Sequence, residues 1–176
     1  NGDFSREYPF PYNQVEFSYA FPNLAFNGSA LYFSSNRPGG LGGFDIYVSY
    51  LKEKEWSKPE NLGPAINTAA NEITPFYKGD KIYFSSDAPK GLGGYDVYGA
   101  SVSEGKWSKA YNMGKGINSP ADDYYLIEAD DEIYYFTSSR LGGKGKDDIY
   151  KAFEKSATWQ YGLQNCSPKT INSLPL

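Results

Sequence analysis

The stretch 33–47, FSSNRPGGLGGFDIY, returns twice further along the chain. It recurs as 84–98 (FSSDAPKGLGGYDVY) and as 136–150 (FTSSRLGGKGKDDIY), so the copies begin 51 and 52 residues apart. Between 31–49 and 82–100, 11 of 19 residues are identical. A chain with such a period folds as a row of similar units, and a period near 50 is longer than that of the common helical-hairpin repeats.

Each copy reads as short β-strands separated by turns. In the second copy, 73–77 and 82–86 are rich in Ile, Phe and Tyr, and a third run, 95–98, follows the glycine-rich loop. Aromatic and β-branched residues favour strands, whereas glycine marks turns. In the first copy, Asn27-Gly28 predicts a type I′ hairpin turn, because both central residues of that turn need positive φ.

A fourth short strand is expected to begin at Trp56 and Trp107, and less distinctly at Trp159. A four-stranded sheet buries its faces only by stacking on neighbouring sheets, so several modules packed radially are the natural arrangement. The predicted fold is all-β: a β-propeller segment of about three four-stranded antiparallel blades. Ordinary propellers have about four to eight blades, so we expect this segment to be part of a larger closed propeller.

The repeat also predicts where the modules begin and end. The expected division is an end of a preceding blade or an N-terminal extension at 1–16, a first blade at 17–67, a second at 68–118, a third at 119–172, and a tail at 173–176. Three blades should not close a ring alone. Either the chain is a piece of a larger protein, which we expect, or it closes by pairing with another copy or another chain.

The order of apolar strand, turn, I/L-Y-F-S-S-[ND], glycine-rich loop and D-[IV]-Y resembles the WD40-like β-propeller repeat of the TolB type, over roughly residues 17–172. It is especially similar to versions in bacterial envelope proteins, where such blades often accompany an OmpA-like peptidoglycan-binding domain. The third copy departs from the pattern, because Lys144-Gly145-Lys146 replaces Leu92-Gly93-Gly94. The resemblance implies a periplasmic or cell-surface protein associated with the outer membrane of a Gram-negative bacterium.

Composition excludes several classes of function. The chain has no His and a single Cys, Cys166, which excludes a Ser-His-Asp or Cys-His catalytic site and an internal disulfide, and makes a zinc site untenable. The net charge is −4 without a basic patch, which argues against nucleic acid as a partner. No apolar run is long enough to span a membrane. We expect no cofactor and no metal site, but calcium binding by the acidic residues at 122–123 and 128–132 stays open.

The candidates for contact with a partner are loop residues. By the arrangement of the family that the repeat resembles, the glycine loops and the Asn-rich connections between modules share one face of the disc. The predicted partner-binding residues on this loop face are Arg37, Asn71, Asp87, Lys90, Asp122, Asp123, Arg140 and Lys144.

A second set recurs at one place in each module and is expected to be structural. Asp45, Asp96 and Asp148 each precede the third strand, where a short carboxylate can accept backbone N–H bonds from the glycine loop. A catalytic residue is needed once, whereas a loop clamp is needed in every blade. Trp56 and Trp107 are expected to pack between neighbouring blades.

The glycine loops themselves do not predict a phosphate cradle. Such a cradle opens a helix whose N-terminal amides bind the phosphate, and here a strand follows the loop. We expect Leu41 and Leu92 to tuck these loops onto their blades.

These observations predict a non-catalytic propeller scaffold for protein-protein interaction. The resemblance implies that it acts in the bacterial cell envelope, as part of a larger outer-membrane-associated lipoprotein tied to peptidoglycan or a secretion machine. Its partners would be envelope proteins, and peptidoglycan through domains outside this chain. Two alternatives stay open. One is a glycan-binding propeller module, favoured by the aromatic content of 18%. The other is the propeller domain of a glycosidase or of a serine peptidase.

Overall fold

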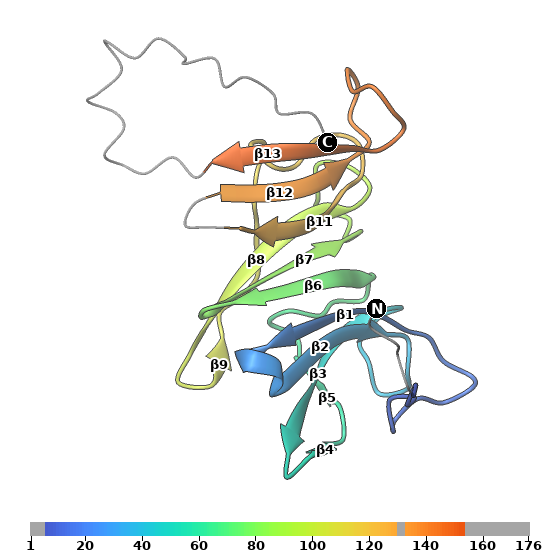
Figure 1. Cartoon of the computed structure of the whole chain (residues 1–176). Coiled ribbons are helices and arrows are strands. Elements are labelled where there is room, and N and C mark those ends of the chain that lie inside the picture. The colour runs from blue at the N-terminus through green and yellow to red at the C-terminus, as the bar shows by residue number, and fades with distance from the viewer. Residues whose placement is uncertain (1–5, 130–132, 154–176) are drawn as a thin grey trace.

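The structure, a computed structural model, describes residues 6–129 and 133–153. Over these residues the chain is all-β, with three antiparallel sheets and one three-residue 3-10 turn, η1 (Phe26–Gly28). The sheets follow one another in sequence order along the molecule, as Figure 1 shows. No sheet closes on itself within the described residues.

In each sheet the first three strands form an antiparallel meander, and in the first two sheets a pair of short strands adds to the third strand. The first contains β1 (Tyr19–Ala25), β2 (Ala30–Ser35), β3 (Asp45–Lys52), β4 (Glu55–Trp56) and β5 (Glu60–Asn61). The second contains β6 (Glu72–Lys78), β7 (Lys81–Ser86), β8 (Asp96–Ser103), β9 (Lys106–Trp107) and β10 (Tyr111–Asn112). The third contains β11 (Asp123–Glu128), β12 (Ile133–Ser138) and β13 (Asp148–Phe153).

The register of the second and third strands is the same in all three sheets. A pair of aromatic residues faces across these strands in each sheet, with ring centroids 6.0, 5.9 and 5.8 Å apart: Phe33–Tyr47, Phe84–Tyr98 and Phe136–Tyr150. The internal repeat of the sequence is therefore a repeat of structure. Residue positions in the three sheets can be compared one for one.

The first strand of each sheet carries the same irregularity. The register shifts near Phe21, Thr74 and Tyr125, whose φ angles are 54°, 52° and 58°. Residues other than glycine seldom adopt such angles, so the shared bulge is a built feature of the repeat. Pro22 and Pro75 follow two of these residues, where the disrupted ladder needs no N–H donor.

The turn at Asn27-Gly28 has the predicted type I′ geometry. Asn27 lies at φ 54° and ψ 35°, and Gly28 at φ 89°. The Ser29 N–H donates to the Phe26 carbonyl at 3.2 Å and closes the turn. Both central residues thus hold the positive φ for which Asn and Gly are suited.

The fourth strand differs from its prediction, because it is broken into two pieces of two residues. β4 and β5 both pair with β3, and the chain between them bulges outward at residues 57–59. Ser57 Oγ accepts from the Tyr50 N–H at 2.9 Å, and Pro59 has no N–H to offer the ladder. In the second sheet, Ser108 repeats the break with Ser101 at 3.0 Å. The strand expected at Trp159 lies outside the described residues.

One apolar core lies between the first and second sheets. It contains Tyr32 and Ile46 from the first sheet and Ile82 and Phe84 from the second. Trp107 packs against this core, as expected for a tryptophan between neighbouring modules. Trp56 does not lie between two sheets, since its ring faces Phe10 of the N-terminal segment at 6.2 Å.

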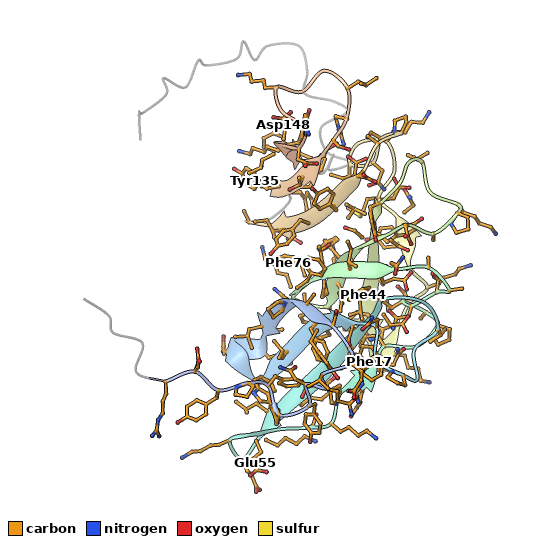
Figure 2. The ribbon with its side chains drawn as sticks, turned by 90° about the vertical axis from the view of Figure 1, so that its right-hand side faces the viewer. Phe17, Phe44, Glu55, Phe76, Tyr135 and Asp148 are labelled. Carbon is orange, nitrogen blue, oxygen red and sulfur yellow. The ribbon has the colours of Figure 1, made fainter. Side chains whose placement is uncertain are left out.

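A second core joins the second sheet to the third. It consists of Tyr83, Val97, Ile117, Leu126, Tyr134 and Phe136, and Phe76 packs against it between the two sheets (Figure 2). Successive side chains of a strand point to opposite faces, so neighbouring residues of one strand serve different cores. The second sheet is therefore covered on both faces.

Among the described residues, the outer face of the third sheet is more exposed than the corresponding faces of the first and second sheets. Ile149 is 79% exposed and Phe153 is 65% exposed, whereas Ile46 and Val97, which are equivalent to Ile149, are fully buried. The same sheet position is thus core in two modules and surface in the third.

This difference can be tested with matched substitutions. We expect Ile46→Ala to lower the free energy of unfolding by about 2–5 kcal/mol, because it leaves a cavity in a packed core. We expect Ile149→Ala to change it by less than about 0.5 kcal/mol, as at other surface positions. Urea unfolding measures both. A loss at Ile149 as large as that at Ile46 would show that this face is covered.

Candidate binding face

A carboxylate clamps each glycine loop. Its Oδ2 accepts the backbone N–H of the residue four places earlier, in the pairs Leu41–Asp45, Leu92–Asp96 and Lys144–Asp148. The carboxylate fills the space next to a glycine: a Cβ on Gly40 would lie 1.9 Å from Asp45 Oδ2. These aspartates occupy the loop-clamp position for which they were proposed from the sequence.

A second clamp was missed by sequence reasoning. The Asn67 amide accepts from the Ile46 N–H at 2.8 Å and donates to the Ile46 carbonyl at 2.9 Å, as a neighbouring strand would. Asn118 makes the same two bonds with Val97, both at 2.8 Å. Both asparagines are buried. Their recurrence in the repeat was the available signal, but the strand that each one reaches cannot be read from spacing alone.

The first glycine loop also holds the chain that enters the second sheet. The Gly43 N–H donates to the Ala70 carbonyl at 3.0 Å, and the Phe44 N–H donates to Asn71 Oδ1 at 3.0 Å. The approach is so close that a Cβ on Gly42 would lie 2.1 Å from the Ala70 oxygen. We call this contact the clasp.

The second glycine loop makes the same clasp. A Cβ on Gly93 would lie 2.1 Å from the Ala121 carbonyl oxygen, and the Tyr95 N–H donates to Asp122 Oδ1 at 2.9 Å. The loops and connections therefore share one end of the sheets, which is the arrangement expected of the loop face. In the third loop, Lys146 stands where Gly43 and Gly94 stand in the others.

Two of the predicted partner-binding residues bind each other. Asn71 donates from its backbone N–H and from its side-chain amide to the two carboxylate oxygens of Asp87, at 2.7 and 2.8 Å. This pair braces the connection between the first and second sheets. Of the remaining predicted residues, Lys90, Asp122 and Lys144 are exposed on the loop face.

Asp123 and Arg140 bind each other: Asp123 is buried and not open to a partner, whereas Arg140 keeps 23% of its side chain exposed and stays a predicted contact residue. The Asp123 carboxylate is completely buried and lies 2.6 Å from Arg140 Nη2. Arg140 Nε donates to Ser138 Oγ at 2.7 Å, and the guanidinium lies over the Phe136 and Tyr150 rings. A buried carboxylate needs a cation or donors close by, and Arg140 provides them.

Arg37 occupies the position of Arg140 in the first sheet without its ion pair. The residue equivalent to Asp123 there is Tyr19, which cannot balance the charge. The Arg37 guanidinium lies 5.6 Å from the centroid of the Tyr47 ring. Its Nη1 and the Tyr19 hydroxyl are both buried without a hydrogen-bond partner.

The leucines of the glycine loops are more exposed than expected. Leu41 and Leu92 do not tuck under their loops but keep 44% and 42% of their surface exposed, because the carboxylate of the clamp fills the inside of the loop. Leu141, at the tip of the third loop, is fully exposed. The tips of the three loops thus carry exposed apolar side chains, which stand beside lysines in the second and third loops.

In the second sheet the buried carboxylate belongs to Glu72. It accepts the Thr68 N–H at 2.8 Å, the Thr68 hydroxyl at 2.7 Å and the Ser86 hydroxyl at 2.8 Å. Burial raises the pKa of the Glu72 carboxyl above its ordinary value, and the hydrogen bonds from Thr68 and Ser86 offset part of that rise.

Metal and membrane sites were also considered for the described residues. Within 6–129 and 133–153, no group of three or more Asp, Glu, His or Cys side chains is placed to hold a metal ion. The acidic residues 130–132 lie outside the described part. Among the described residues there is no helix with the length and apolar character that a membrane crossing requires.

Comparison with known proteins assigns no family to this chain. No protein-family model matches the chain, and no curated protein matches it. Among solved structures it is similar to a puromycin-hydrolyzing peptidase of Mycobacterium tuberculosis, with 14% sequence identity and a TM-score of 0.48. The similarity covers 69% of this chain and 19% of the peptidase, so this chain spans about a fifth of that protein.

The clasp makes a prediction about two glycines. Gly93→Ala should lower the free energy of unfolding by about 1–3 kcal/mol or more, because its methyl group would overlap a backbone carbonyl that cannot move independently. Gly116→Ala is the matched control, since a Cβ there would meet no atom within 4 Å. Thermal unfolding compares the two. Equal losses at both glycines would contradict the clasp.

The buried Glu72 predicts a dependence of stability on pH. Since its pKa is raised on folding from 4.5, the folded state holds the proton more tightly than the unfolded chain. As the pH rises above about 4.5 and through the raised pKa of Glu72, the protein with Glu72 should therefore lose stability relative to the Glu72→Gln variant. Urea unfolding of both proteins from about pH 4 to pH 8 measures the difference. A difference that does not change with pH would contradict this account.

Proposed function

We propose that the three sheets are consecutive blades of a β-propeller that serves as a non-catalytic scaffold for protein-protein interaction in the bacterial cell envelope. The propeller part of this proposal is supported by the regular succession of the sheets. Each sheet has the same register and packs on the next through an apolar core. Stacking of repeated four-stranded sheets around an axis is how propellers bury both faces of each sheet.

The outer face of the third sheet gives further support. Its exposed Ile149 occupies a position that a neighbouring sheet covers in the first two modules, and Phe153 occupies that of Tyr50, which packs against the first core. A further blade, in a longer form of this protein, would bury this surface as the second sheet buries Ile46. Lys146 indicates that the clasp to that blade would differ from the first two, because a side chain replaces the glycine there.

The observation that favours a scaffold is how the polar residues of the loop face are used. Those that recur in the repeat are occupied as clamps and braces, whereas the residues that differ between modules lie at exposed loop tips. The tip residues that differ are Lys90, Leu141 and Lys144, whereas the exposed Leu41 and Leu92 share the one position that Lys144 takes in the third module. A rigid face with varied tips suits recognition of a protein surface, since little order has to be gained on binding.

The envelope setting is supported by the resemblance of the repeat to TolB-type blades of envelope proteins. In that setting the partners would be proteins of the outer membrane or periplasm. Attachment to peptidoglycan would come from domains outside this chain.

The scaffold function can be tested by changing the tips. A variant with Leu141→Asp and Lys144→Glu should lose at least about 90% of any captured protein from an envelope extract of a Gram-negative bacterium, because added negative charge at exposed contacts disfavours the bound state. The bait is the whole chain, and the captured proteins are quantified by mass spectrometry.

A control variant separates binding from folding. Lys54→Glu reverses a charge at an exposed turn on the opposite end of the first sheet, and should leave capture unchanged. Circular dichroism should show that both variants fold. If the tip variant captures the same proteins in the same amounts as the control, the loop face is not the binding surface and the proposal fails.

A further inference from the structure

A cleft of about 650 Å³ opens on the loop face between the first and second sheets. One wall is the connection 64–71 that leaves the first sheet, and the other is the start of the second glycine loop with the aromatic pair Phe84 and Tyr98. Ala88 lies in the lining. The volume is in the range of sites that bind small ligands or single side chains.

In the third module an arginine side chain fills the place equivalent to this cleft. Ala88 and Arg140 are equivalent, because each donates its backbone N–H at 3.2 Å to the Oγ of the serine two residues earlier, Ser86 or Ser138. The Arg140 side chain lies over the aromatic pair of its own sheet and donates to the Ile117 carbonyl and to Asp123. In the second module, alanine leaves the equivalent space open.

The open cleft keeps the groups that Arg140 binds in the third module. Phe84 and Tyr98 stack with centroids 5.9 Å apart and an interplanar angle of 19°, close to the 5.8 Å and 24° of the pair under Arg140. Ile66, equivalent to Ile117, lines the cleft. The Ile66 carbonyl is therefore equivalent to the Ile117 carbonyl, which accepts a hydrogen bond from Arg140.

The charge at this place is also unbalanced. Glu72 takes the position of Asp123 and is completely buried. It accepts hydrogen bonds from Thr68 and Ser86, but among the described residues it forms no ion pair. Glu72 itself does not line the cleft, but Thr68 and Ser86, which hold its carboxylate, do. A cation in the cleft would be attracted to this carboxylate through surroundings that screen the attraction less than water does.

We infer that the cleft binds the guanidinium group of an arginine side chain supplied by a partner protein. The partner's arginine would lie over Phe84 and Tyr98 and take the place that Arg140 fills in the third module. The identity of the occupant as a protein rests on the scaffold function proposed above, whereas the chemistry of the cleft does not.

Arginine fits this cleft better than lysine does. A guanidinium is planar, stacks on aromatic faces and donates in a fixed plane to a carbonyl and a carboxylate together, whereas an ammonium is a compact and strongly hydrated charge. Lys90 and Lys109 stand on the rim and oppose any cation. Their removal should therefore strengthen binding.

The direct test uses N-acetyl-arginine amide as the probe and the whole chain labelled with ¹⁵N. Titration followed by NMR should give saturable shifts of the amide signals of Ile66, Ser86 and Ala88. N-acetyl-citrulline amide, which has the same shape without the charge, should bind at least about tenfold more weakly, since it lacks charge-assisted hydrogen bonds. Equal affinity for the two probes, or shifts spread over unrelated residues, would overturn the inference.

Two variants locate the site. Ala88→Arg should abolish binding of the probe, because the chain then fills its own cleft as it does in the third module. Glu72→Gln should weaken binding at least about tenfold while leaving the cleft open. If Ala88→Arg does not fold, Glu72→Gln and the probe pair still decide the question. Unchanged affinity in a folded Ala88→Arg variant would place the probe elsewhere and contradict the inference.

The small probe and the capture experiment fail independently. If N-acetyl-arginine amide binds but the tip variant captures proteins as well as the control does, the arginine site is supported and the scaffold function is contradicted. If capture depends on the tips but the arginine and citrulline probes behave alike, the scaffold function stands and the arginine site falls.

Discussion

The clasp between each of the first two glycine loops and the connection that follows it is the contact on which the arrangement of the described sheets depends. It brings two backbones so close that only glycine fits at Gly42 and Gly93. Backbone N–H groups of the loop are thereby satisfied by the chain that enters the next sheet. The apolar cores hold the sheets together face to face, and the clasp fixes where along that face each new sheet begins.

The positions of Glu72 and Ala88 show how one place in the repeat is occupied in three ways. The third module has a carboxylate paired with arginine, Asp123 and Arg140. The second has a longer carboxylate, Glu72, held by hydroxyl groups, with no arginine. The first has an arginine without a carboxylate. Because these positions lie beside the clasp, the variation alters the chemistry of the loop face without altering the path of the backbone.

The sequence predicted the features that depend on local spacing. The strands, the type I′ turn and the aspartate clamps follow from patterns within about fifteen residues, because the interacting groups are near in the chain. The amide of Asn67, the break in the fourth strand and the burial of Asp123 were not predicted. Each depends on which strand or module a side chain reaches across, and a repeat of unknown register does not contain that information.

Native-state hydrogen exchange would test the clasp most directly. The Glu72 and Asp123 N–H groups donate to the carbonyls of Phe44 and Tyr95 at 2.6 and 2.7 Å, at the ends of the two clasps. If the clasps hold the sheets together, these amides should exchange only on global unfolding, as slowly as the amides of core strand β7. If they instead exchange through local opening, at rates typical of exposed loops while β7 stays protected, the clasp is not what joins the sheets.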